Sequence, residues 1–353
     1  MDQPIGTPLR VGVLSTTAWR TPPRAYGPWE QVASNVAEGL FARGHDVTLF
    51  ATRDSITAGR LEALAPRGYE EDRTLDAKAW EALHIGRAME RSDRLDLLHN
   101  HFDFLPLAWS RLIRCPMVTT IHGFSSEKIF PVFREYADTC LYVSISDADR
   151  HPDLPYAATV YNGIRLDQFT LRNTPGAYAV VLGRIHPDKG IHHAIEAARA
   201  AEIPLVIAGI VQDEAYFHER IEPTLDGDRV RFIGPVGPAE RDELLGGALA
   251  LLHLVEFAEP FGLAMTEAMA CGTPVIGTRR GAVPEVVEDG VTGFIVDDVA
   301  GAVDALRGVR TLDRARCRDR VAGRFTVDQM VEGYLAVYRE ALARRAAAGG
   351  QFR

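Results

Sequence analysis

The sequence predicts an α/β protein in which two Rossmann-like domains face each other across a cleft. Short apolar runs alternate with helical patterns along the chain, as they do in doubly wound parallel sheets. An Asn-Gly turn signal within residues 161–169 divides this alternation into two halves of similar size. The chain has 353 residues, which is enough for two domains of ordinary size.

The composition excludes several other classes of protein. Hydrophobic residues make up 46% of the chain and charged residues 25%, as in a globular protein. The net charge of −9 argues against nucleic acid or a strongly anionic membrane surface as the main partner. The chain shows no signal-peptide pattern, no apolar run as long as a membrane span and no Cys-x-x-Cys pair among its four cysteines. We therefore expect a soluble cytoplasmic protein with reduced thiols and no integral membrane segment.

The first half of the chain, residues 1–163, contains one predicted sheet. It opens with an apolar run at 10–15 that suits a central strand of a parallel sheet. A helix is predicted at 28–42, where apolar residues recur at helical spacing until Gly44 ends the pattern. Further strands are predicted at residues 47–51, 96–99, 117–121, 140–145 and 159–161.

The second half, residues 164–325, shows the same alternation. Its strands are predicted at residues 179–182, 205–208, 230–233, 248–255, 275–277 and 294–296, with helices at 191–200 and 263–270. An amphipathic helical pattern at 327–347 follows. The halves show no sequence-level repeat, so the second sheet is predicted from its own pattern alone.

The rest of the chain is organised around residues 256–285. A strand, a glycine-containing loop and a helix N-terminus make an anion site here, because the first N–H groups of a helix have no partners within it. Glu259 in the loop and Glu267 about one turn into the helix bracket this site. Carboxylates would repel a phosphate, so we expect them to accept hydrogen bonds from sugar hydroxyls. This arrangement suits a sugar joined to a nucleoside diphosphate.

The Glu-x7-Glu pattern in EPFGLAMTE, followed by CGTPVIGT and GAVPEVVEDGVTGFIV, closely resembles the family-4 glycosyltransferases. The resemblance implies the two-domain GT-B fold and transfer of a sugar from a nucleotide donor with retention of configuration. It further implies an acceptor-side domain at 1–163, a nucleotide-sugar-binding domain at 164–325 and a C-terminal helix at 326–353 that packs back on the first domain. The competing interpretation is an ordinary strand–helix unit with two solvated glutamates.

The resemblance assigns roles to five residues of this stretch. Glu267 resembles the residue that holds the ribose hydroxyls, and Glu259 the one that contacts the transferred sugar. The backbone N–H groups of Phe261, Gly262 and Leu263 are expected near that sugar and the donor phosphates. Both glutamates are expected to be ionised acceptors. The donor is expected to be a UDP- or GDP-type sugar acting as co-substrate, with no further cofactor.

Two cations lie after the first predicted strand of the second half, in LGRIHPDKG. Arg184 supplies a planar donor fork and Lys189 a point charge, a combination suited to a diphosphate. The pair resembles the family's Arg-x4-Lys, which binds the donor phosphates and stabilises the leaving diphosphate without a metal. No metal site is therefore expected. Two solvated surface cations are the alternative.

Histidines mark two predicted strand ends in the first half. His122, in TTIHG, resembles the family histidine that lies against the donor sugar and the reacting centre; otherwise it is structural or exposed. His99 and His101, in HNHFD, point the same way on a strand, as two metal ligands would. No further ligands follow at suitable spacing, so we expect polar contacts to the acceptor instead.

Two other polar pairs are given no catalytic role. Asp147 and Asp149 could be mistaken for the metal-binding Asp-x-Asp of the other large glycosyltransferase fold, but we expect them at a solvated helix start. His192 and His193 are expected to be structural or solvated.

The loop before the first helix departs from the family pattern of two adjacent glycines, since it carries Gly27 followed by Pro28. Proline has no N–H to donate, so we expect Pro28 to start the helix and Gly27 alone to meet the donor phosphate. The surrounding YGPWE resembles short family members that act on small acceptors such as pterins or antibiotic oligosaccharides.

The sequence thus favours a metal-independent, retaining glycosyltransferase that moves a sugar to a hydroxyl of a small-molecule or saccharide acceptor. A nucleotide-sugar epimerase of the same architecture would share the nucleotide site without needing an acceptor pocket. A catalytically inactive sugar-nucleotide-binding regulator is a further alternative. An NAD-dependent dehydrogenase is disfavoured, because no G-x-G-x-x-G follows the first strand.

Overall fold

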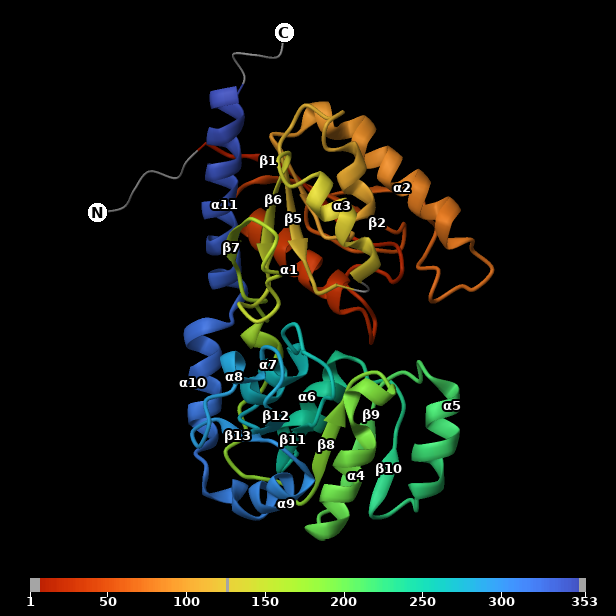
Figure 1. Cartoon of the computed structure of the whole chain (residues 1–353), viewed down its shortest axis with the longest axis vertical. Helices are drawn as coiled ribbons and strands as arrows, with labels where there is room; N and C mark the ends of the chain where they lie inside the picture. The colour runs from red at the N-terminus through yellow and green to blue at the C-terminus, as the bar shows by residue number, and fades with distance from the viewer. Residues whose placement is uncertain (1–6, 125–126, 349–353) are drawn as a thin grey trace, which may run out of the picture.

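The computed structural model describes residues 7–124 and 127–348, which form two parallel β-sheets with helices on both faces of each (Figure 1). The N-terminal sheet has seven strands in the order β3-β2-β1-β4-β5-β6-β7. Its strands are β1 (Arg10–Leu14), β2 (Asp46–Ala51), β3 (Arg60–Ala63), β4 (Leu97–Asn100), β5 (Met117–Ile121), β6 (Cys140–Ser144) and β7 (Tyr156–Thr159).

The second sheet has six strands in the order β10-β9-β8-β11-β12-β13, again all parallel. Its strands are β8 (Ala179–Leu182), β9 (Leu205–Ala208), β10 (Val230–Phe232), β11 (Ala250–His253), β12 (Val275–Thr278) and β13 (Gly293–Val296). The predicted architecture of two parallel-sheet α/β domains is therefore confirmed.

Helices cover both faces of each sheet because the strands are apolar on both sides. In the N-terminal domain α1 and α11 cover one face, and α2 and α3 cover the other. In the second domain α4 and α9 lie opposite α7 and α10. The α-helices are α1 (Pro28–Ala42), α2 (Ala77–Arg91), α3 (Phe130–Glu135), α4 (Ile191–Ala200), α5 (Glu214–Tyr216), α6 (Pro238–Gly246), α7 (Leu263–Ala270), α8 (Val283–Val286), α9 (Val299–Gly308), α10 (Arg314–Arg324) and α11 (Val327–Ala348).

Three strand predictions were wrong in detail. The strand expected at 159–161 lies earlier, at Tyr156–Thr159, and the run 248–255 forms a strand only over Ala250–His253 because its last residues are a buried loop. Strand β3 was missed, since it is a half-exposed edge strand without a clear apolar pattern. All three errors concern the ends or the edge of a sheet, where the periodic signal is weakest.

Helix α1 begins as its sequence predicts. Gly27 is its N-cap with φ of 148°, a conformation that favours glycine, and Pro28 is the first helical residue. A side chain at Gly27 would place its Cβ 2.9 Å from atoms of both Pro23 and Glu30. A larger residue at 27 would therefore strain the fold as well as narrow the cavity beside it.

The last helix, α11, packs on the N-terminal domain and runs alongside α1 (Figure 1). Val331 and Tyr334 belong to the same buried cluster as Val32 and Val36 of α1. The close approach depends on Gly39, where an added Cβ would lie 2.6 Å from Val331 Cγ2. No helix of the described chain is long and apolar enough to cross a membrane.

This close approach predicts opposite outcomes for two glycine-to-alanine substitutions. Both Gly39 and Gly86 are interior helix positions, so alanine should add about 1 kcal/mol of helix propensity at either one. Nothing lies within 4 Å of an added Cβ at Gly86, and Gly86→Ala should raise the melting temperature. Gly39→Ala should lower it, because overpacking against Val331 costs about 1–3 kcal/mol. Thermal melts of both variants test this, and a similar rise in both would contradict the packing described.

Candidate active site

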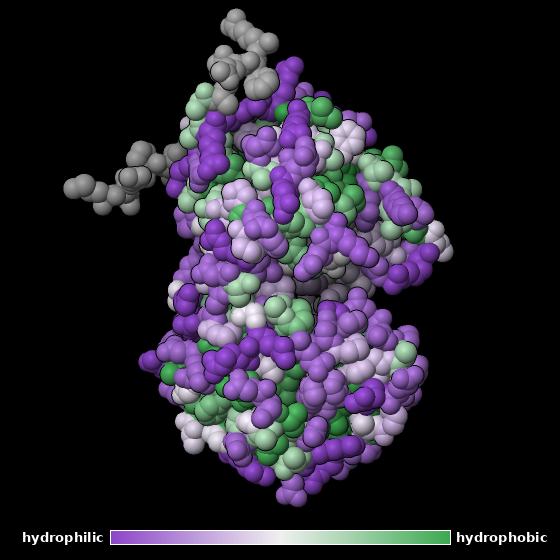
Figure 2. All heavy atoms as spheres, viewed as in Figure 1, coloured by the Kyte–Doolittle hydropathy of each residue, from purple (hydrophilic) through white to green (hydrophobic). Residues whose placement is uncertain are grey.

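The candidate site is a cavity between the two domains, which Figure 2 shows as a hollow at the middle of the molecule. Its volume is about 900 Å³, and residues of both domains line it. The carboxyl ends of parallel strands supply much of its lining: β8 leads into the loop with Arg184, β11 into the loop with Glu259, and β5 ends just before His122. This is where ligands bind in open α/β sheets.

Glu259 is the centre of the second domain's wall. It is only 6% exposed, and its Oε2 accepts from Lys189 Nζ at 2.7 Å and lies 3.0 Å from His253 Nε2. Burial alone would raise the pKa of this carboxyl, but Lys189 and His253 lower it to about 2, so Glu259 is ionised. Lys189 Nζ also lies 4.5 Å from the centre of the Phe257 ring, which fixes the ammonium over the cavity.

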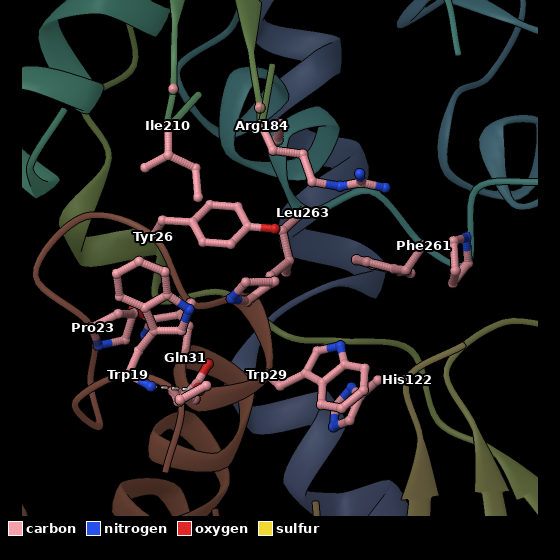
Figure 3. A pocket seen from close by; sticks show the side chains of 18 of the residues that line it. Trp19, Pro23, Tyr26, Trp29, Gln31, His122, Arg184, Ile210, Phe261 and Leu263 are labelled. Atoms are coloured by element: carbon pink, nitrogen blue, oxygen red, sulfur yellow. Dashed lines mark hydrogen bonds between the residues drawn. The ribbon is translucent and has the colours of Figure 1, made fainter. Parts of the chain in front are cut away.

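Arg184 extends from the end of β8 into the cavity (Figure 3). Its guanidinium donates to Gln212 Oε1 at 2.8 Å and to Asp188 Oδ2 at 2.5 Å. Tyr26 of the N-terminal loop reaches toward it from the other domain; burial raises the pKa of the Tyr26 hydroxyl, and the nearby Arg184 charge opposes that rise. The two domains thus meet over the guanidinium.

The N-terminus of α7 supplies backbone donors to the same wall. Gly262 is the N-cap with φ of 81°, and a side chain there would place its Cβ 2.5 Å from Met265 Cε and 3.3 Å from Glu259 Cγ. Phe261 is buried and holds the loop, while Leu263 begins the helix. The Met265 N–H bonds to the Gly262 carbonyl at 2.9 Å, whereas helix geometry leaves the N–H groups of Leu263 and Ala264 without partners within α7. Both residues line the cavity, so this end of the helix is suited to an anion.

Glu267 lies on α7 beside the cavity, four residues after its first helical residue. It is 5% exposed and pairs with Arg241 of α6 at 3.1 Å. Burial raises the pKa of the Glu267 carboxyl, although Arg241 opposes the rise. The expectation of an ionised acceptor is thus met by Glu259, whereas the pKa of Glu267 moves in the opposite direction.

His122 lies in the N-terminal wall, where its ring stacks on Trp29 with ring centres 5.4 Å apart (Figure 3). Its Nε2 is 2.9 Å from His101 Nδ1. Burial lowers the pKa of His122 to about 3, so the imidazole is neutral. A neutral, fixed imidazole can hold a hydroxyl but carries no charge toward a donor phosphate.

The expectation that His99 and His101 contact an acceptor is wrong. Both are fully buried and do not line the cavity. His99 lies 2.7 Å from the Tyr338 hydroxyl and 2.8 Å from Thr120 Oγ1, and burial lowers its pKa to about 3. These side chains form a core network that connects α11 to His122 through His101.

Asp147 and Asp149 do not start a helix, which corrects a second expectation. Glu285 of the second domain accepts from the backbone N–H groups of Asp147 at 2.9 Å and of Ala148 at 2.7 Å. Asp149 is partly buried, and burial raises its pKa to about 8. The segment is a contact between the two domains.

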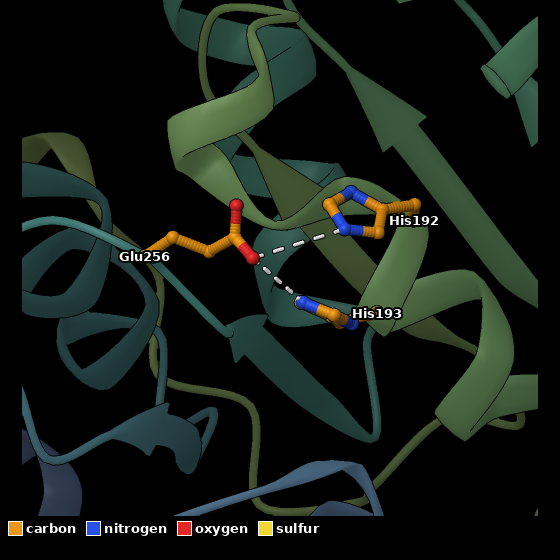
Figure 4. A group of neighbouring side chains, drawn as sticks. All are labelled: His192, His193 and Glu256. Carbon is orange, nitrogen blue, oxygen red and sulfur yellow. Dashed lines mark hydrogen bonds and ion pairs between the residues drawn. The ribbon is translucent and has the colours of Figure 1, made fainter.

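His192 and His193 do not simply face solvent. They form a group with Glu256 in which His193 Nε2 lies 2.9 Å from the carboxylate and His192 Nε2 lies 3.9 Å from it (Figure 4). His192 Nδ1 is 2.8 Å from the Tyr216 hydroxyl. The three side chains are of metal-ligating types with ligand atoms within 4.8 Å of one another, and they tie the start of α4 to the loop after β11.

Sequence analysis assigned no role to four further residues that line the cavity: Arg241, His253, Tyr26 and Trp29. Two of them carried a usable signal, since His253 is a polar residue within the apolar run 248–255 and Tyr26 belongs to the loop that holds Gly27. Arg241 carried none, because it lies in a helix of mixed polarity and meets Glu267 only through the packing of α6 on α7.

Solved structures with the same two-domain arrangement define the fold. AviGT4, a glycosyltransferase involved in avilamycin A biosynthesis, superposes with a TM-score of 0.73 at 23% identity, over 95% of this chain and 98% of that one. A sucrose-phosphate synthase from Thermosynechococcus elongatus gives 0.76 at 20% identity, over 95% and 100%. Anabaena HepE in complex with UDP and glucose gives 0.73 at 19% identity, over 93% and 99%. The fold is that of the GT-B glycosyltransferases.

Sequence relatives define the family. Residues 165–312 match the family described as "Glycosyl transferases group 1", and residues 29–168 match "Glycosyltransferase Family 4". The N-acetyl-alpha-D-glucosaminyl L-malate synthase of Bacillus anthracis is 39% identical over 364 residues, covering 88% of this chain and 93% of that enzyme. A glycogen synthase of Mycobacterium tuberculosis is 29% identical over 365 residues, covering 83% and 84%. The chain belongs to the family-4 glycosyltransferases.

The ion pair between Lys189 and Glu259 predicts a pH-dependent loss of stability on Lys189→Met. In the wild type the lowered pKa of Glu259 means that its charge stabilises the fold above the ordinary glutamate pKa, and that this stabilisation is lost only as the pH falls toward about 2. Without the ammonium, burial dominates and raises that pKa, so the variant should lose stability as the pH rises. Removing one partner of a buried pair costs about 3–5 kcal/mol.

Thermal melts at about pH 5 and about pH 7 test this, with the larger drop expected at the higher value. Lys78→Met on the exposed face of α2 is the matched control and should melt like the wild type at both. An equal drop at both pH values would show that the ammonium does not hold the charge on Glu259.

Proposed function

We propose that the protein transfers a sugar from a nucleotide-diphospho-sugar to a hydroxyl of a small-molecule or saccharide acceptor, with retention and without a metal. The observation that supports this best is the composition of one wall of the cavity. Two cations, a helix N-terminus and two buried carboxylates lie together there: Arg184, Lys189, the start of α7, Glu259 and Glu267. Cations and N–H groups suit a diphosphate, and the carboxylates suit the sugars on either side of it.

In this proposal the donor lies along the second domain. The diphosphate contacts Arg184, Lys189 and the N–H groups at the start of α7, with Gly27 approaching from the other side. Glu267 accepts from the ribose hydroxyls and Glu259 from the transferred sugar. The ammonium of Lys189 has three N–H donors, so it can hold Glu259 and a phosphate oxygen at once. UDP is the favoured nucleotide, because the related HepE structure holds UDP and glucose.

The proposed reaction uses groups that are already in place. The acceptor oxygen bonds to the anomeric carbon on the face from which the diphosphate leaves, the carbon–oxygen bond to phosphate breaks, and its electron pair stays on the phosphate oxygen. The acceptor proton passes to that oxygen. Arg184 and Lys189 stabilise the charge that grows on the diphosphate, and neutral His122 positions the sugar without acting as a base.

An epimerase would share the proposed donor wall with a glycosyltransferase, so the two functions are distinguished by the opposite wall. Trp19, Tyr26 and Trp29 extend the cavity over the N-terminal domain. This lining on the domain opposite the proposed donor site supports an acceptor site, which an epimerase would not need.

The proposal is tested by incubating the protein with UDP-, GDP- and dTDP-sugars and following release of nucleoside diphosphate, with and without EDTA. We expect release from a UDP-sugar, an unchanged rate in EDTA, and a product whose anomeric configuration by NMR matches the donor's. An inverted product would contradict retention. A loss of activity that Mg²⁺ or Mn²⁺ restores would contradict metal independence, and repeating the assay with His193→Ala would show whether the His192–His193–Glu256 group is involved.

Substitution of the two carboxylates should impair different properties: UDP affinity in one variant and kcat in the other. Glu267→Gln should weaken the binding of bare UDP about tenfold, because it removes an acceptor for the ribose hydroxyls. Glu259→Gln should leave UDP affinity nearly unchanged and lower kcat by about 10²-fold, because it removes an acceptor for the transferred sugar. Calorimetry with UDP measures the affinity and steady-state assays measure kcat. Glu196→Gln, at an exposed position of α4, is the control. If only the Glu259 variant lost UDP affinity, the roles assigned to the two glutamates would have to be exchanged.

A further inference from the structure

Charge is divided unequally between the two walls of the cavity. The Lys and Arg side chains that line it within the described chain are Arg184, Lys189 and Arg241, and all three belong to the second domain. In the proposed function the first two face the donor diphosphate, and Arg241 is already paired with Glu267 at 3.1 Å. The cations of the cavity are thus committed to the donor side.

The N-terminal wall carries three acidic residues, Glu30, Glu81 and Asp103. Two arginines adjoin this wall in sequence, Arg20 and Arg24, and neither lines the cavity. Arg24 pairs with Asp54 and Glu71. The undescribed residues 125 and 126 are both serine and add no charge. The acceptor side is therefore acidic.

Two of these acids keep acceptor capacity for a ligand. Glu30 is 2% exposed, and its Oε1 accepts from Thr16 Oγ1 and, at 3.2 Å, from the Trp19 N–H. Its Oε2 points toward Gly27, where an added Cβ would lie 2.9 Å away. Glu81 accepts from the Tyr69 hydroxyl at 2.9 Å through Oε1. Burial raises the pKa of Glu30 to about 7 and also raises the pKa of Glu81, so both ionise less readily than a solvated glutamate. A carboxyl group in either form keeps lone pairs that can accept further O–H or N–H donors.

Flat aromatic surfaces lie between these acids. Trp19 and Tyr26 meet edge to face with ring centres 5.8 Å apart, and Trp29 stacks on His122 (Figure 3). Phe102 and Phe104 complete the wall. Aromatic faces provide a large apolar contact for a ring, and a few polar groups between them fix its orientation.

We propose that the acceptor site on this N-terminal wall selects an uncharged, ring-bearing acceptor and rejects acceptors that carry a phosphate or carboxylate. The inference rests on the proposed function for its choice of wall. Its reason is electrostatic: an anionic acceptor would enter a partly enclosed site that presents carboxylates and aromatic faces and whose cations are already paired or face the donor. An uncharged ring stacks on the tryptophans and donates its hydroxyl or N–H groups to Glu30 and Glu81.

The test compares probes that differ only in one anionic group: myo-inositol with inositol 3-phosphate, and glucose with glucose 6-phosphate. Binding of each to the UDP-saturated protein is measured by ligand-observed NMR and calorimetry. We expect the neutral member of a pair to bind about tenfold more tightly or better. Equal or tighter binding of the phosphorylated member overturns the proposal, and so does failure of both neutral rings to bind.

Charge-changing variants on α2 locate the effect. Glu81→Arg gives the wall a cation and should shift the neutral-to-anionic affinity ratio toward the anion by about tenfold or more. Glu90→Arg makes the same charge change on an exposed part of the same helix, where the Glu90 side chain is 70% exposed, and should leave the ratio unchanged. An equal shift in both variants would assign the preference to overall charge and overturn the subsite.

Two further controls keep the result interpretable. If Glu81→Arg does not fold, Glu81→Gln keeps the shape of the side chain, removes one charge and should shift the ratio in the same direction by less. UDP binding is measured separately in the same calorimetric series. If UDP does not bind, the proposed function fails, while the probes are still compared on the free protein and decide the subsite independently.

Discussion

The candidate site depends on one buried charge, the carboxylate of Glu259. It remains ionised at low exposure only because Lys189 and His253 converge on the same oxygen. These partners come from the loop after β8 and the end of β11, so pairing requires both loops to be held tightly. Two glycines allow this: a Cβ at Gly190 would lie 1.8 Å from the Leu254 carbonyl, and one at Gly281 would lie 2.3 Å from the Glu259 backbone. Close backbone contacts and the Lys189–Glu259 ion pair therefore hold this wall of the cavity together.

Within the described chain, the N-terminal domain contributes acidic and aromatic side chains and a neutral histidine to the cavity, and no Lys or Arg. On the side away from the cavity, the His122 ring contacts His101 through Nε2. His101 belongs to a core network with His99 and the tyrosines of α11. Because α11 follows the second domain in the chain and packs on the first, the position of His122 depends on residues more than 200 positions away. The C-terminal helix thus supports the site as well as the fold.

Contacts between the two domains also position the cavity. Glu285 accepts from backbone N–H groups of Asp147 and Ala148, and Tyr26 reaches over Arg184. Asp149, whose pKa burial raises, is enclosed at the same contact. A cavity bounded in this way brings together a cationic wall of the second domain and an acidic, aromatic wall of the N-terminal domain. In the proposed function this asymmetry gives the two substrates separate sites.

The two-domain α/β architecture could be predicted from the sequence alone, because buried parallel strands are apolar on both faces and their alternation with helices is a local pattern. The sequence also located Arg184, Lys189, Glu259 and Glu267, since each follows a predicted strand within a short motif. Which partners these groups contact is seen only in the folded chain. Arg241 pairs with Glu267 through helix packing, and the three acids of the N-terminal wall come from α1, α2 and the loop after β4. Such groupings depend on which surfaces pack against each other in the folded chain, and a local sequence pattern does not specify this.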